Sequence, residues 1–220
     1  MDYPWLSRAF KRLVPSSVNQ KQQEHFQHSV TRVTKRLDRG RETEGLDLWD
    51  LVLGQKEGRG LSRDEMDANA SLFMMAGTET TATLLSGLTY HLLRNPKSME
   101  KLMKEIRGQF ASAEEMTMER LATLPYLSAC IKEAFRVYPP SPLGPPRITP
   151  EHGSTIVGSF VPPGSVVSIP QYVMNTNEKN FKKPLQYIPE RWLGDQEFDS
   201  DQRQAVQPFS VGSMDCVGKK

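Results

Sequence analysis

The stretch LSRDEMDANASLFMMAGTETTATLLSGLTYHLLRNP, residues 61–96, decides the fold of this chain. Ser62 followed by Glu65 forms a capping box, which predicts that a helix begins here, and the Asn-Pro pair at the far end predicts where it stops. About 33 residues at about 1.5 Å each make a helix of about 50 Å, long enough to cross a domain. Because residues 70–88 carry almost no charge, we expect the middle of this helix to be buried.

Outward from this helix, the sequence changes character once. Apolar residues at helical spacing dominate up to Tyr138, whereas β-branched runs broken by Pro and Gly follow Pro139 and predict short strands. From Asn175 onward, the apolar residues show little periodicity. We therefore predict a mainly α fold with a small β-sheet region. Its three parts are a helical part at 1–138, a strand and irregular part at 139–207, and a cysteine loop at 208–220.

Composition limits the class of protein. The chain has 220 residues, of which 37% are hydrophobic and 25% charged, so it can bury a core as a soluble domain does. Its net charge of +2 disfavours nucleic acid as a partner. No apolar run reaches about 18 residues, so no transmembrane segment is predicted. The two cysteines, Cys130 and Cys216, do not suggest a disulfide framework.

The first chemical motif is AGTETT, residues 76–81, in the middle of the long helix. Glu79 is a charge in an apolar setting, and burying it is costly unless it is paired. The Thr80 hydroxyl can bond to the carbonyl of Ala76 and bend the helix, while Gly77 leaves a gap beside it. This pattern favours a groove that delivers protons, and a helix crossing built from small residues is the alternative.

The second motif is KEAFR, in which Glu133 and Arg136 share one face of a helix. Most such pairs are solvated and contribute little to stability. This helix is strongly apolar, however, and a third charge, Arg191, stands in the irregular segment as part of PERW. A cluster of these three side chains could hold the irregular segment against the helix.

The third motif is PFSVGSMDCVG, residues 208–218, which contains Cys216. Gly212 permits a tight turn, and Gly218 permits a close approach of the backbone. No second Cys or His stands at zinc-ligand spacing, and no histidine completes a catalytic pattern with this thiol. A nucleophile, an inert thiol and a single axial metal ligand remain. A thiolate bound to haem iron requires no partner residue, only amide donors and a shaped loop.

Four motifs now stand in order: AGTETT, KEAFR, YIPERW and PFSVGSMDCVG. Together they resemble the cytochrome P-450 superfamily of haem-thiolate monooxygenases, and the resemblance covers essentially the whole chain. The flanking stretches TATLLSGLTYHLL and VPPGSVVSIPQY are most similar to fungal microsomal members that act on secondary metabolites. The resemblance implies the C-terminal part of that fold, with a long central helix, a Glu-x-x-Arg helix, an irregular meander and a cysteine loop.

The resemblance also implies roles for individual residues. The catalytic residues would be Glu79 and Thr80, which would relay protons to iron-bound dioxygen. Structural roles would fall to Glu133, Arg136 and Arg191. The residues implied to bind haem b are Cys216 as the axial iron ligand, Arg147 at a propionate, Phe209, Gly212 and Gly218 around the thiolate, and Ala76 and Gly77 at the oxygen groove.

The implied reaction inserts one oxygen atom from dioxygen into a lipophilic small molecule. Electrons would come from NADPH through a partner reductase. By resemblance, the full-length protein would lie on the cytosolic face of the endoplasmic reticulum membrane, held by an N-terminal anchor that this sequence does not contain. Isomerase or dehydratase chemistry on the same scaffold would not need the Glu79–Thr80 pair.

Two departures from the family pattern matter. Met214 stands where the family usually has a basic residue that pairs with a haem propionate, which should weaken haem anchoring by about 1–2 kcal/mol. Members of the family are also considerably longer, and the helix that follows the cysteine, whose dipole helps to stabilise a thiolate, is reduced here to a few residues. The alternative interpretation is therefore a truncated, non-catalytic fragment that does not bind haem stably.

Overall fold

The computed structural model describes residues 15–40, 47–54, 60–213 and 215–219. The prediction made for Met214 therefore lies outside the described residues. By its internal contacts the chain divides into two compact units, Met1–Thr78 and Glu79–Lys220, and each is considered by itself. The described residues are mainly helical, with two small antiparallel sheets, which confirms the predicted fold class.

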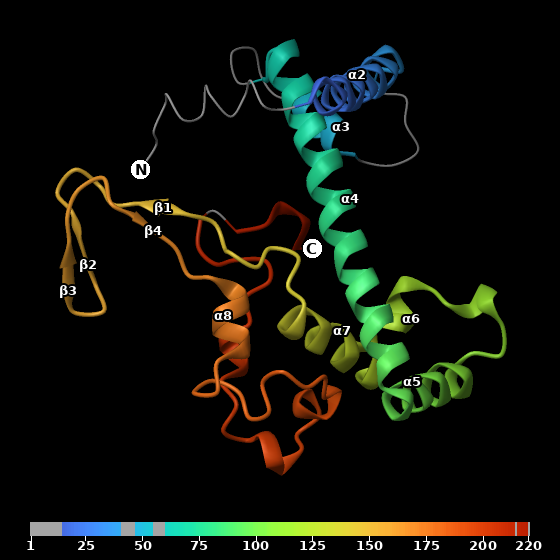
Figure 1. Ribbon diagram of the computed structural model, residues 1–220. Helices are drawn as coiled ribbons and strands as arrows, with labels where there is room; N and C mark the ends of the chain where they lie inside the picture. Colours follow the sequence, from blue (N-terminus) through green and yellow to red (C-terminus); the bar gives the residue numbers. More distant parts are fainter. Residues whose placement is uncertain (1–14, 41–46, 55–59, 214, 220) are drawn as a thin grey trace. The chain divides into compact units, whose positions relative to one another are not determined.

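The helices follow one another along most of the chain (Figure 1). The α-helices are α2 (Ser16–Asp38), α3 (Leu48–Leu53), α4 (Arg63–Arg94), α5 (Pro96–Gln109), α6 (Met118–Ala122), α7 (Pro125–Val137) and α8 (Gln171–Thr176). The short 3-10 helices are η1 (Ala113–Glu115), η2 (Pro189–Trp192), η3 (Gln196–Phe198), η4 (Arg203–Ala205) and η5 (Val217–Lys219).

The strands form two separate antiparallel pairs between α7 and α8. Strand β1 (Arg147–Ile148) pairs with β4 (Val166–Val167), and β2 (Ser154–Ile156) pairs with β3 (Ser159–Val161) as a hairpin (Figure 1). Because each strand has only two or three residues, these pairs contribute little core of their own.

The long helix α4 begins as its sequence predicts. The backbone N–H of Ser62 donates to the Glu65 carboxylate at 2.7 Å, and the Glu65 N–H donates back to the Ser62 hydroxyl at 3.3 Å. This reciprocal pair satisfies two donors that the first turn of a helix leaves open. The helix ends at Arg94, and Pro96 then opens α5. The predicted capping box and the predicted end are both confirmed.

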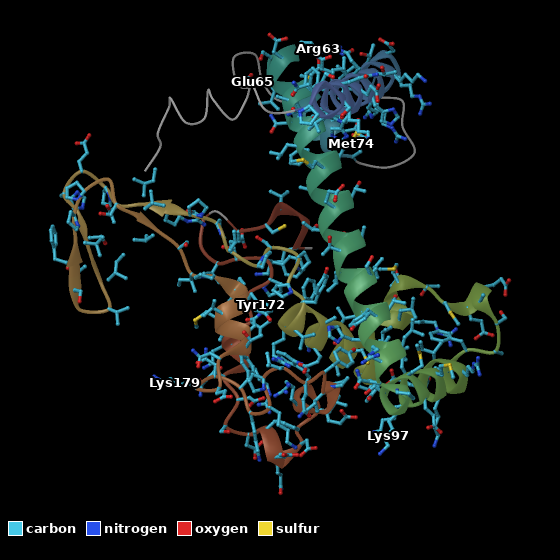
Figure 2. All side chains as sticks on the ribbon, in the orientation of Figure 1. Arg63, Glu65, Met74, Lys97, Tyr172 and Lys179 are labelled. Atoms are coloured by element: carbon cyan, nitrogen blue, oxygen red, sulfur yellow. The ribbon has the colours of Figure 1, made fainter. Side chains whose placement is uncertain are left out.

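In the first unit, α2 packs against the first half of α4. The Ser29 hydroxyl, which is fully buried, contacts the Met74 sulfur at 3.3 Å, and Figure 2 marks Met74 where the two helices meet. Arg36 of α2 reaches α3 by donating to Asp47 at 2.5 Å and to Asp50 at 2.6 Å. The hydrogen bond from Arg36 lowers the pKa of Asp47 to about 2.

The core of the second unit lies between the end of α4, α5 and α7. Its buried members are Leu88, Leu92, Leu102, Tyr126, Cys130, Ala134 and Tyr187. Gly87 allows the closest approach in this core, because a Cβ atom at that position would lie 2.3 Å from the Tyr138 ring. Burial raises the pKa of the Cys130 thiol to about 11, so this cysteine stays a neutral core residue, as its sequence context indicates.

The expected burial of the middle of α4 is wrong for the described residues. Ala70 and Leu88, at the two ends of the apolar stretch, are buried. Between them, Leu72 and Met75 are each 52% exposed and Leu85 is 55% exposed. An apolar helix face is buried only where another element covers it, and no described element covers this one. The composition of the helix indicated that its apolar side chains need a neighbouring element, but it could not show which element would pack against them.

Candidate functional site

Glu133 is the centre of a fully buried charge cluster on α7. Its two carboxylate oxygens accept hydrogen bonds from Nε and Nη2 of Arg136 at 2.9 and 2.8 Å, which is the bidentate geometry that makes Arg–carboxylate pairs strong. Nε of Arg191 donates to the same carboxylate at 3.0 Å. All three side chains are 0% exposed. The structure therefore brings together the three residues that the sequence grouped as structural.

Arg136 connects this cluster to α8 and to the irregular segment that follows it. With the donors not used by Glu133, its guanidinium donates to the backbone carbonyls of Asn175, Pro184 and Gln186 at 2.9, 2.5 and 2.7 Å. Each of these hydrogen bonds is charge-assisted, and the guanidinium that donates them is fully buried. Arg136 thus shapes the path of the segment that leads toward the cysteine loop.

A second carboxylate, Asp201, completes the cluster, and the sequence patterns did not reveal it. Its side chain is 0% exposed and accepts a charge-assisted hydrogen bond from Nη1 of Arg191. Its other oxygen accepts the backbone N–H of Lys182 at 2.7 Å. Charge counting could have predicted such a residue. Two buried arginines and one glutamate leave a positive charge that a low-dielectric interior does not tolerate.

The indole of Trp192 is another contact that the sequence patterns missed. Its Nε1–H donates to the Glu133 carboxylate at 2.9 Å, as does the backbone N–H of Ile188. A tryptophan directly after the arginine of PERW is the one signal for this role, because a buried indole N–H needs an acceptor.

The cysteine loop is a tight turn closed by its own backbone. The N–H of Cys216 donates to the carbonyl of Phe209 at 2.9 Å, which joins the two ends of the loop. Gly212 has φ of +88°, a conformation that glycine adopts without steric cost, and so meets the predicted need for a tight turn. The Phe209 ring packs edge-on against Phe135 of α7, with 5.5 Å between ring centroids. The base of the loop is thus attached to the helix that carries Glu133.

The Cys216 side chain is exposed, in contrast to buried Cys130, and both are free thiols. Among residues 15–40, 47–54, 60–213 and 215–219, no three His, Cys, Asp or Glu side chains gather as a metal site. At Gly218, a Cβ atom would lie 3.8 Å from the Cys216 sulfur, so the backbone runs close beside the thiol. An accessible lone sulfur on a closed loop fits a group that takes one protein ligand, as haem iron does, and does not fit a structural zinc ion.

The other residues predicted to act at haem are exposed. Arg147 lies on β1, where its guanidinium donates to the neighbouring carbonyl of Pro146 at 3.2 Å. Ala76, Gly77, Glu79 and Thr80 all lie on the exposed part of α4. Their roles at haem remain predictions.

A hollow of about 940 Å³ lies in the first unit between α2 and the first half of α4. Phe26, Leu72 and Met75 supply its apolar wall, and Gln22 and Gln23 supply polar groups. The rest of the lining is also polar, namely Asn19, His25, Gln27 and Ser71, so the hollow has one apolar wall in a largely polar surround.

The fold and the site together define a mainly helical protein with an exposed thiol on a closed loop and a buried charge cluster on the helix against which the base of that loop packs. A cytochrome P-450 family model matches residues 3–220. The chain therefore belongs to the cytochrome P-450 family.

Individual relatives agree with this assignment. The chain is 49% identical over 218 residues to cytochrome P-450 monooxygenase FUM2 of Gibberella moniliformis (strain M3125 / FGSC 7600), covering 99% of this chain and 46% of that protein. It is 45% identical to cytochrome P-450 monooxygenase efuB of Hormonema carpetanum (98% of this chain, 43% of that protein). It is 42% identical to cytochrome P-450 monooxygenase lcsI of Purpureocillium lilacinum (99% and 42%). The chain thus spans less than half of the length of these relatives.

No helix in the described part of the chain has both the length and the apolarity to cross a membrane.

Proposed function

We propose that this protein is a haem-thiolate monooxygenase that inserts one atom of dioxygen into a lipophilic small molecule, in the secondary metabolism of a fungus. The observation that carries the proposal is the placement of Cys216. Its thiol is exposed on a closed turn, and the base of that turn rests on the helix of the buried charge cluster. A thiolate ligand must be accessible to the metal and fixed in direction, and this loop supports both requirements.

Each remaining residue would have a limited task. When bound, haem b would supply the iron at which dioxygen is activated. Cys216 would hold that group through its thiolate, and Arg147 would hold a propionate through its guanidinium. On α4, the Glu79 carboxylate and the Thr80 hydroxyl would hold and transfer protons at the oxygen groove.

The nature of the substrate is inferred from the hollow beside α2. Phe26, Leu72 and Met75 form its apolar wall. On the same helix, Leu72 precedes the AGTETT motif by about one turn and Met75 directly precedes it. Apolar side chains in this position favour a lipophilic substrate. Electrons would come from NADPH through a reductase, and the whole protein would act at the endoplasmic reticulum membrane.

The alternative is a chain that does not bind haem stably. The uncovered apolar face of α4, at Leu72, Met75 and Leu85, favours it, because exposed apolar surface of this kind weakens packing around the oxygen groove. In that case the charge cluster would be retained without catalysis.

A carbon monoxide difference spectrum separates the two. The chain is loaded with haem, reduced and exposed to carbon monoxide, and a thiolate-ligated band is expected. Cys216→Ser should abolish that band, whereas Cys130→Ala, a change at the buried thiol, should retain it. A wild-type chain without the band would overturn the monooxygenase proposal for this chain, and a band that survives Cys216→Ser would overturn the ligand assignment.

A further inference from the structure

We propose that Asp201 is a positioning residue for the Cys216 loop, acting through Arg191 and the segment between Asp201 and Phe209. The inference rests on the proposed role of Cys216 as the haem ligand and deepens it. The Asp201 side chain contacts Arg191 and the backbone N–H of Lys182, and would act on the thiol only through the chain that follows it. It fixes the position of the backbone from which the segment leading to Cys216 continues.

The first argument is charge. Arg136 and Arg191 are both fully buried, and Glu133 alone neutralises one of them. The Asp201 carboxylate, also fully buried, brings the cluster to net neutrality. Removing one partner of a buried ion pair strands the other charge in a medium that solvates it poorly. Removing the Asp201 carboxylate would therefore leave one buried positive charge without compensation.

The second argument is direction. Asp201 holds two parts of the irregular segment at once, since it accepts from Arg191 and from the backbone N–H of Lys182. The next residue, Gln202, donates its N–H to the Asn180 carbonyl at 2.8 Å. Nε of Arg203 donates to the Arg191 carbonyl at 2.6 Å. Three consecutive residues are thus fixed to the cluster and its surroundings.

The third argument is the path from this fixed point to the thiol. The N–H of Gln207 donates to the Gln171 side chain at 3.2 Å, and the Phe209 ring rests on Phe135. The Phe209 carbonyl then accepts the Cys216 N–H. These contacts depend on the position and direction of the backbone at Asp201. If that backbone moved, the contacts of Gln207, Phe209 and Cys216 would all be displaced.

The test compares Asp201→Asn with Asp199→Asn, the same change at an exposed neighbour. Asparagine retains the shape of the side chain and an acceptor for Lys182, but it loses the charge that faces Arg191. Amide hydrogen exchange is measured on the chain without haem. In Asp201→Asn, the amides of Gln202, Gln207 and Cys216 are expected to exchange at least about a hundredfold faster, while amides of α5 change less than about threefold. Asp199→Asn should match wild type throughout.

Asp201→Glu serves as the second variant, because it keeps the charge and displaces it by one methylene. It is expected to fold and to show the same selective pattern at about tenfold. If amide exchange in α5 were accelerated as much as exchange in the loop in either variant, Asp201 would stabilise the whole fold without positioning the loop. That result would overturn the proposal. Unchanged exchange at Gln207 and Cys216 in Asp201→Asn would overturn it as well.

Haem loading gives a second readout. The reduced carbon monoxide complex of Asp201→Asn should hold a smaller thiolate-ligated fraction than wild type or Asp199→Asn, because the loop presents the sulfur less consistently. An unchanged fraction would contradict the positioning role even if exchange accelerates. If wild type itself lacks the thiolate band, the haem proposal fails, and the exchange data then decide separately whether Asp201 positions the loop.

Discussion

The Tyr187 hydroxyl donates a hydrogen bond of 3.0 Å to the backbone carbonyl of Cys130, and both residues are buried. This contact joins the irregular segment to α7 one turn before the charge cluster. It fixes the segment to α7 just before η2, which packs against the same helix.

Tyr187→Phe removes this hydrogen bond and keeps the ring. We expect the free energy of unfolding to fall by about 1 kcal/mol, because one buried hydrogen bond is lost while the packing stays. Urea denaturation measures the change. Tyr90→Phe is the matched control, since Tyr90 is 60% exposed and should change stability by less than about 0.5 kcal/mol. Equal losses in the two variants would contradict this explanation.

The His91 imidazole stacks on the Tyr187 ring, with centroids 5.1 Å apart and planes within 8°. Burial lowers the pKa of His91 below its ordinary value, outweighing attraction by Glu133, and Arg136 lowers it further. The unfolded chain thus binds more protons than the folded one around pH 6.5. The contribution of neutral His91 to the free energy of unfolding should therefore be complete above pH 6.5. It should decrease as the pH falls toward the lowered pKa.

His91→Phe should reduce this acid dependence, since phenylalanine can stack on Tyr187 without taking a proton. Urea denaturation at several values between about pH 7 and pH 5 measures the slope. His152→Phe makes the same change at an exposed position and should leave the wild-type slope in place. A slope unaffected by His91→Phe would show that other groups cause the acid dependence.

Glu105 of α5 caps the first turn of α7. Its carboxylate accepts the backbone N–H groups of Tyr126 at 2.8 Å and Leu127 at 2.9 Å. Glu105→Ala should cost about 1–2 kcal/mol, as the loss of a helix cap does, with an added loss of charge at the positive end of the helix dipole. Thermal unfolding measures it. Glu100→Ala, at an exposed position of the same helix, should cost less than about 0.5 kcal/mol.

Two glycines of α4 should respond in opposite directions to alanine. Gly87→Ala places a Cβ atom 2.3 Å from the Tyr138 ring and should destabilise by about 1–3 kcal/mol. At Gly77 no atom lies within 4 Å of the added carbon. Gly77→Ala should therefore stabilise by about 0.5–1 kcal/mol through helix propensity alone. Equal effects at the two positions, measured by urea denaturation, would contradict the close packing at Gly87.

Local signals in the sequence predicted the helices well. The capping box at Ser62 and the proline at position 96 each act within one turn, so their effect does not depend on the rest of the fold. The grouping of Glu133, Arg136 and Arg191 was also predictable, because charges in an apolar helix need buried partners.

Features that depend on distant parts of the chain were not predictable in the same way. Asp201 and Trp192 sit in a segment without periodicity, and their local sequence does not show that Asp201 pairs with Arg191 or that Trp192 donates to Glu133. The exposure of Leu85 has the same origin, because composition reports how apolar a helix is and not which element covers it. The positions of Arg147 and Glu79 at haem remain predictions for that reason.

The charge cluster also imposes an order on folding. Glu133 and Arg136 share one helix and can pair as soon as α7 forms, but Arg191 follows Glu133 by 58 residues. At about 5–20 residues per second, a ribosome needs about 3–12 s to synthesise that interval. During this time the carboxylate has only one of its two arginines and the apolar face of α7 lacks the segment that covers it. The nascent chain is therefore most exposed to misfolding and to chaperone binding in the seconds before its meander emerges.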